Sequence, residues 1–179
     1  DAFSMSAFNL TTLSGFYGLM FIYFALMGAM AAAMWGSEII SKEERNKTVE
    51  FSLVLPVSRS RVVTAKALAA LVNCVLYVLI TWGVSLVAVR PYGPDQAFRN
   101  YLALEMQAML LIELIFLAVG LLLGWAMKQY RRTGAIAIAL ILVTYFVSVI
   151  SGMQKNLEFL KWVTPFRYFD AGELFRSGG

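Results

Sequence analysis

The sequence has 179 residues, of which 60% are hydrophobic and 15% are charged. Soluble globular domains carry about a quarter charged residues, so this composition excludes an ordinary soluble fold and predicts a membrane protein. The net charge is +4. We expect the basic residues to face anionic lipid and not to bind nucleic acid, because the basic residues of membrane proteins gather in cytoplasmic loops. The lack of histidine and the single cysteine, Cys74, exclude imidazole chemistry and an intrachain disulfide.

Four apolar stretches follow one another along the chain, each long enough to cross the hydrocarbon core of a bilayer as a helix. The segments between them carry most of the charged residues. We therefore predict an all-α integral membrane protein that forms a single transmembrane domain over residues 1–179. The predicted spans cover residues 13–36, 67–89, 101–127 and 133–154.

The basic residues of the connecting segments predict the orientation of these spans. The segments after the first and third spans carry most of them, namely Lys42, Arg45, Lys47, Arg59, Arg61, Lys66, Lys128, Arg131 and Arg132. The segment after the second span carries only Arg90 and Arg99. The positive-inside rule then places residues 41–66 in the cytoplasm and both chain ends outside. We expect a multi-pass protein of the cell (plasma) membrane, of the prokaryotic inner-membrane kind.

The cytoplasmic segment 41–66 has the local features of a helix. Ser41 and Glu44 form a capping-box pattern that predicts a helix start, and Pro56 predicts its end. The first half of this predicted helix is charged and the second half is apolar. From these residues alone it is either a solvated loop helix anchored at the lipid interface or a docking element for another protein.

Two acidic residues lie inside the third predicted span. Glu105 and Glu113 are eight residues apart, a little over two helical turns, so they share roughly one face. A carboxyl group at membrane depth is costly and is a functional candidate by default, which makes this pair and Asn73 candidates for a translocation pathway. The alternative is a structural hydrogen bond from Glu113 to a neighbouring helix, for example to Asn73.

The last part of the chain, residues 155–179, mixes aromatic and charged side chains and contains Pro165. This mixture is typical of helices that lie on a membrane surface or dip into one leaflet. We therefore predict outer interfacial helices over these residues.

The run KEERNKTVEFSLVLPVSRSRVVTAK resembles the signature of type-2 ABC-transporter permeases. In that family, acidic residues precede a Thr-x-Glu and a leucine-rich turn; Pro-Val-Ser-Arg follows, and a basic residue opens the next span. The corresponding residues here are Glu43, Glu44, Thr48, Glu50, Leu53, Leu55, Pro56 to Arg59, and Lys66. Lys47 stands where the family usually has glycine. The later segment KWVTPFRYFDAGELFRSG also resembles the family.

The resemblance implies an ATP-driven exporter in which this chain is the permease subunit. The four spans would match spans two to five of a six-span permease, and segment 41–66 would contain the coupling helix that docks on an ABC ATP-binding subunit. The expected contact region consists of Glu43, Glu44, Arg45, Lys47, Thr48, Glu50 and Phe51. A second copy of the permease, or a related permease, would complete a dimer.

We expect no catalytic residue, cofactor or metal on this chain, and ATP with Mg²⁺ on the partner subunit. The sequence contains no G-x-x-x-x-G-K-[ST] phosphate loop, so it is not the ATPase. Two rival functions belong to other classes. One is a transporter or channel driven by an ion gradient through Glu113, and the other is a non-transporting membrane sensor or anchor docked to an ABC ATPase.

Overall fold

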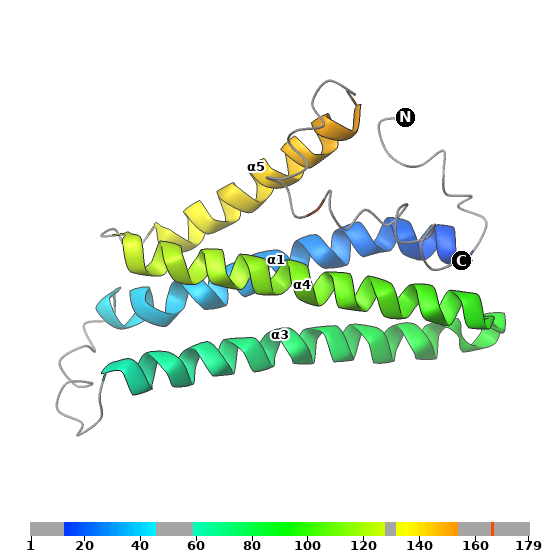
Figure 1. Cartoon of the computed structure of the whole chain (residues 1–179), viewed down its shortest axis with the longest axis horizontal. Coiled ribbons are helices and arrows are strands. Elements are labelled where there is room, and N and C mark those ends of the chain that lie inside the picture. The colour runs from blue at the N-terminus through cyan, green and yellow to red at the C-terminus, as the bar shows by residue number, and fades with distance from the viewer. Residues whose placement is uncertain (1–12, 46–58, 128–131, 154–165, 167–179) are drawn as a thin grey trace.

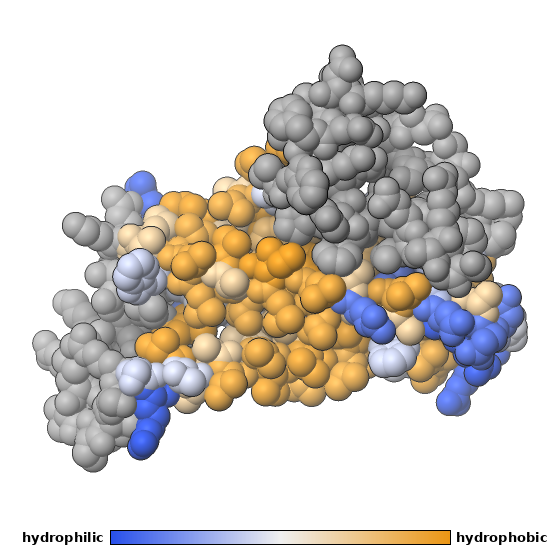
Figure 2. All heavy atoms as spheres, in the orientation of Figure 1, coloured by the Kyte–Doolittle hydropathy of each residue, from blue (hydrophilic) through white to orange (hydrophobic). Residues whose placement is uncertain are grey.

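A computed structural model describes residues 13–45, 59–127, 132–153 and 166, and these residues contain helices but no strand. The long helices are α1 (Leu13–Arg45), α3 (Arg59–Val89), α4 (Gln96–Ala126) and α5 (Thr133–Met153). All four are long and apolar enough to cross a membrane, so the prediction of an all-α membrane protein with four spans is confirmed. Figure 2 shows an apolar band across the bundle, with hydrophilic residues toward both ends.

The connection between α3 and α4 is a tight turn built from proline and glycine. A short 3-10 helix, η2 (Arg90–Tyr92), follows α3 directly, and Gly93 ends it with a left-handed φ of 59°, a conformation that favours glycine. The side chain of Asp95 then caps α4 by accepting a hydrogen bond from the backbone N–H of Phe98 at 2.9 Å. This turn holds α3 and α4 antiparallel.

The first helix extends further than the sequence pattern indicates. The capping-box pattern predicts a new helix that begins at Ser41, but α1 continues through this position to Arg45. A capping residue needs a non-helical backbone, whereas Ser41 is followed by Lys and Glu residues that favour helix continuation. The predicted start at Ser41 is therefore wrong. Residues 46–58 lie outside the described part of the chain.

The helices differ in how closely they pack. Figure 1 shows α1, α3 and α4 side by side along the long axis, while α5 diverges from the other three along its length. Contact between α1 and α4 is by far the most extensive in the bundle. These two helices run parallel, because Ala33 of α1 lies against Gly120 of α4 and Ser37, one turn later, lies against Gly124.

Glycines bring the backbones of α1 and α4 into direct contact. A Cβ atom at Gly120 would lie 2.9 Å from the Cα of Ala33, and one at Gly124 would lie 2.8 Å from the carbonyl oxygen of Ser37. Gly36 of α1 meets the backbone of α4 in the same way, at Leu117 and Leu121. Small residues at this spacing allow close approach of helices in lipid, where packing and not water exclusion drives association.

Hydrogen bonds from side chains join the described parts of α1 and the antiparallel α3. The Nζ of Lys66 donates to the carbonyl oxygen of Ile39 at 3.4 Å, near one end of the pair. The hydroxyl of Tyr77 donates to the carbonyl oxygen of Phe24 at 3.1 Å, and the hydroxyl of Tyr17 donates to Ser85 at 3.4 Å. These bonds are spread along the length of α3, which also packs Ala70 and Cys74 into an apolar cluster with residues of α1 and α4.

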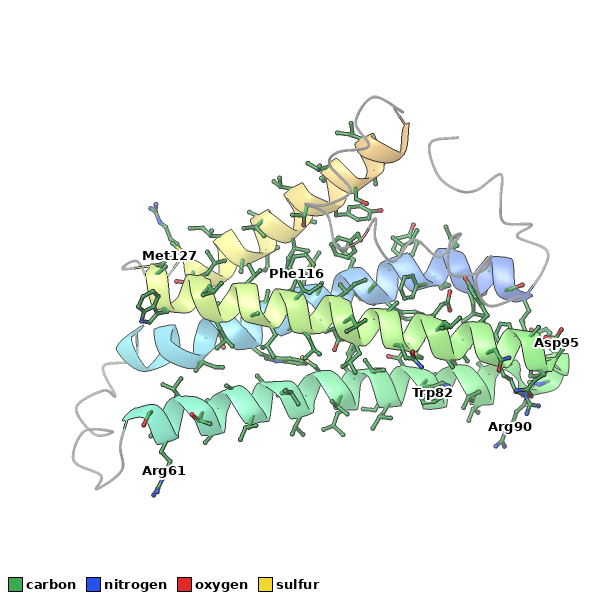
Figure 3. The ribbon with its side chains drawn as sticks, viewed as in Figure 1. Arg61, Trp82, Arg90, Asp95, Phe116 and Met127 are labelled. Atoms are coloured by element: carbon green, nitrogen blue, oxygen red, sulfur yellow. The ribbon has the colours of Figure 1, made fainter. Side chains whose placement is uncertain are left out.

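Phe166 is the single described residue beyond α5. Its ring lies 5.3 Å from that of Phe116 on α4 and 5.9 Å from that of Tyr145 on α5, measured between ring centres. Figure 3 shows Phe116 between these two helices. Phe166 therefore fills part of the space where α5 leaves α4. The remainder of the predicted interfacial segment 155–179 lies outside the described residues.

The contact between α1 and α4 predicts a sharp difference between two glycine substitutions. We expect Gly120→Ala to lower the free energy of unfolding by about 1–3 kcal/mol, because the added methyl group meets backbone atoms that do not yield. The matched control is Gly134→Ala on α5, where a Cβ meets nothing within 4 Å. Thermal unfolding in detergent measures both, and equal midpoints for the two variants would contradict the packing described.

Candidate functional site

Glu113 lies where α1, α3 and α4 meet. Its side chain is completely buried, and its Oε1 occupies the space that a side chain at position 28 of α1 would fill. The ring of Tyr77 from α3 also approaches Gly28, where a Cβ would lie 3.0 Å from the Tyr77 Cε1. The carboxyl group and the aromatic ring therefore reach α1 together only because residue 28 is glycine.

The carboxyl group of Glu113 has no hydrogen-bond partner within the described residues, at either oxygen. The Tyr77 hydroxyl donates to the carbonyl oxygen of Phe24 instead. Cys74 is buried on α3 and lies beside the carboxyl group, but a thiol is only a weak donor. Almost all buried polar groups in proteins are hydrogen-bonded, so this exception identifies Glu113 as a candidate functional residue.

Glu105 is the second buried carboxyl group of α4, and 1% of its surface is exposed. Its polar neighbour is Tyr101, one turn earlier on the same helix. Its Oε1 has no hydrogen-bond partner among the described residues. Glu105 and Glu113 thus both lie inside the bundle on one helix, two turns apart, and neither is compensated by a basic side chain in the described residues.

Asn73 lies on the exposed face of α3, away from these carboxyl groups. The alternative hydrogen bond between Glu113 and Asn73 is therefore not formed, since within the described residues neither Glu113 oxygen has a partner. Adjacent residues on a helix are rotated by about 100°, so Cys74, not Asn73, faces α4. The spacing of the buried residues Ala70, Cys74 and Val78 along α3 is the signal that distinguishes the two faces.

The expected docking residues are divided between two parts of the chain. Glu43, Glu44 and Arg45 form the last turn of α1, at the end of the bundle where α3 begins. The others, Lys47, Thr48, Glu50 and Phe51, lie outside the described residues. The hydrogen bond from Lys66 to Ile39 joins α3 to α1 just below this turn.

The described residues include no cluster of three Cys, Asp or Glu side chains close enough to hold a metal ion. The two carboxyl groups of α4 are two turns apart along the helix axis, about 12 Å, and therefore do not share one site. What the arrangement offers is an isolated, buried acid at a junction of three helices.

A family model described as ABC-2 family transporter protein matches residues 2–173 of the chain. The match covers nearly the whole sequence. It is a match to the same family whose signature the segment 43–66 resembles. No curated protein and no solved structure matches the chain.

The geometry around Glu113 predicts an unusual stability effect. We expect Glu113→Met to leave the thermal midpoint unchanged or to raise it, since the variant removes a buried polar group that has no partner, which costs about 1–3 kcal/mol. The matched control is Ile112→Met, a volume-conserving change at the adjacent, fully buried position of α4. A midpoint for Glu113→Met clearly below that of Ile112→Met would show that the carboxyl group holds the helices together.

Proposed function

We propose that this chain, which belongs to the ABC-2 transporter family and is the membrane permease subunit of an ABC transporter, moves its substrate outward by using ATP hydrolysis on a separate ABC ATP-binding subunit. The family match supports the permease role. The sequence has no phosphate loop, so ATP and Mg²⁺ are assigned to the partner. The cell (plasma) membrane, of the prokaryotic inner-membrane kind, is the proposed location.

The single observation that best supports coupling to a partner is the continuity of α1. No residue of α1 is charged from Leu13 to Ser37, and the helix continues without a break through Glu38 to Arg45. The residues from Glu38 onward extend it by about 12 Å, which would carry Glu43, Glu44 and Arg45 beyond the hydrocarbon core. We assign the ATPase contact to this end of α1 and to Lys47, Thr48, Glu50 and Phe51 in the segment that follows.

The packing of α1 suggests where a push from the partner would go. Backbone contact at Gly36, Gly120 and Gly124 leaves no room for α1 and α4 to slide past each other. A displacement of α1 would therefore carry α4, and with it Glu105 and Glu113. Both α3 and α5 contact this pair far less than α1 and α4 contact each other, so relative motion is expected at those boundaries.

Glu113, Glu105 and Asn73 are the proposed translocation-pathway residues of this subunit. A second copy of the chain, or a related permease, is the proposed partner within the lipid bilayer. A specific observation also favours one alternative: the unpartnered carboxyl group of Glu113 suits a transporter driven by an ion gradient, because intramembrane acids commonly mark ion pathways.

Charge reversal in the docking region tests the proposal. We expect the triple variant Glu43→Lys, Glu44→Lys and Glu50→Lys to reduce co-purification with the ABC ATP-binding subunit and substrate-stimulated ATPase activity at least tenfold, because like charges across an interface repel. The matched control is Arg99→Glu, an exposed charge reversal at the opposite end of the bundle, which leaves both quantities unchanged. Co-purification and ATPase assays in lipid nanodiscs measure them.

Three outcomes contradict the proposal in different ways. Unchanged assembly and ATPase activity in the triple variant would remove the docking role from this region. Substrate flux that follows an ion gradient without ATP would favour the Glu113-dependent alternative. Intact ATPase binding with no flux of any substrate would indicate a membrane sensor or anchor.

A further inference from the structure

Two acidic side chains are buried inside the described bundle without a basic side chain to balance them. Glu105 and Glu113 are 1% and 0% exposed, whereas every lysine and arginine whose side chain is described is at least partly exposed. Cys74 of α3 lies beside Glu113. The basic residues on either side of it along the helix axis, Lys66 and Arg90, are about 12 Å and 24 Å away. The described interior thus offers carboxyl groups but no cation.

The carboxyl group of Glu113 is the better placed of the two to meet a ligand. Neither of its oxygens has a hydrogen-bond partner within the described residues. Its Oε1 occupies the space that a side chain at position 28 would fill, so the group points across the junction of the helices. A buried carboxylate is stable only where a positive charge is paired with it. A ligand that brings a positive charge to this junction supplies what the described residues do not.

Aromatic and apolar side chains surround this carboxyl group. The ring of Tyr77 approaches Gly28 together with the Glu113 Oε1. Phe116, one turn after Glu113 on α4, is buried in the same apolar cluster as Met109, one turn before it. The face of an aromatic ring attracts a cation, and more strongly where water is absent. These surroundings suit an ion that has an apolar body.

A metal ion suits the same place poorly. Mg²⁺ and Ca²⁺ take about six to eight oxygen ligands. The described residues include no cluster of acidic or cysteine side chains that could hold a metal ion, and Glu105 lies about 12 Å from Glu113 along α4. An organic cation needs a single counter-charge and an apolar wall, and this junction provides both.

The boundary between α3 and the α1–α4 pair gives a route to the carboxyl group. Contact of α3 with either helix is far less extensive than the contact of α1 with α4. The hydroxyl of Tyr77 donates to the carbonyl oxygen of Phe24 across this boundary at 3.1 Å. Outward displacement of α3 would break this bond. It would then expose the Glu113 carboxyl group on α4 and the Tyr77 ring on α3 to the same opening.

We propose that the transported substrate is a lipophilic organic cation, whose positive charge is held by the Glu113 carboxyl group and whose apolar body packs against the Tyr77 ring. An anion of the same size and apolar surface would meet the same walls, but the carboxyl groups of Glu113 and Glu105 would repel it. Charge, and not size or apolar surface, is therefore the property that the site selects.

This inference names a substrate class for the proposed function, on which it rests for the presence of a transport pathway at Glu113. It also gives a reason for a buried acid that costs stability. The same carboxyl group would serve an inorganic ion in the gradient-driven alternative, whereas here the ligand is the transported organic molecule itself.

A matched pair of ions tests the charge preference. Tetraphenylphosphonium and tetraphenylborate have nearly the same size and apolar surface but opposite charge. Binding of radiolabelled tetraphenylphosphonium is measured on the full chain in nanodiscs, with and without its ABC ATP-binding subunit, and empty nanodiscs serve as the blank. We expect saturable binding that an equal concentration of tetraphenylborate does not displace.

Two pairs of variants then test the residues. We expect Glu113→Gln to weaken tetraphenylphosphonium binding about tenfold, because the amide keeps the shape and loses the charge, while the control Ile112→Met keeps the native affinity. We expect Tyr77→Leu to weaken binding about fivefold and Tyr77→Phe to retain it, because the attraction comes from the ring and not from the hydroxyl.

Three results overturn the inference: binding no stronger than the blank, displacement by the anion, or native affinity in Glu113→Gln. The comparison of the two ions needs no variant, so it holds even where a substitution disturbs folding. Binding also needs no ATP hydrolysis, which separates this inference from the proposed function. Charge-selective binding with no stimulation of ATPase activity would overturn ATP-driven transport alone, and ATPase activity stimulated equally by both ions would overturn the cation preference alone.

Discussion

Direct contact between the backbones of α1 and α4 is the constraint on which the rest of this bundle depends. Gly36, Gly120 and Gly124 remove the side chains that would otherwise hold the two helices apart. In lipid, apolar side chains gain little by leaving one apolar surrounding for another, so helix association relies on close packing. The contact is made along parallel helices and aligns Ala33 with Gly120 and Ser37 with Gly124.

This alignment explains the character of the candidate site. It brings Gly28 of α1 against Glu113, where the carboxyl group occupies the space left by the missing side chain. An acid that has no hydrogen-bond partner among the described residues is tolerated there because the surrounding helices are held in place by other contacts, including the hydrogen bond from Tyr77 to Phe24. We expect the close packing of α1 against α4 to offset the cost of burying this polar group.

Much of the fold follows from hydropathy, because a chain in a bilayer must satisfy its backbone hydrogen bonds within helices. The four spans were predictable on this basis. The exposed face of α3 was not, because lipid and the protein interior are both apolar and leave little periodic contrast along the helix. The end of α1 was also mispredicted, since a capping-box pattern at Ser41 does not interrupt a helix whose following residues favour continuation.

The proposed ATP-driven mechanism requires α1 and α4 to move as one body. The most direct test is the distance between spin labels at Tyr23 of α1 and Trp125 of α4, both exposed, measured by pulsed electron paramagnetic resonance in the active complex with and without ATP. We expect this distance to change by less than about 2 Å between the two states. A shift of a helical turn, about 5 Å, would show that the helices slide past each other and would contradict it.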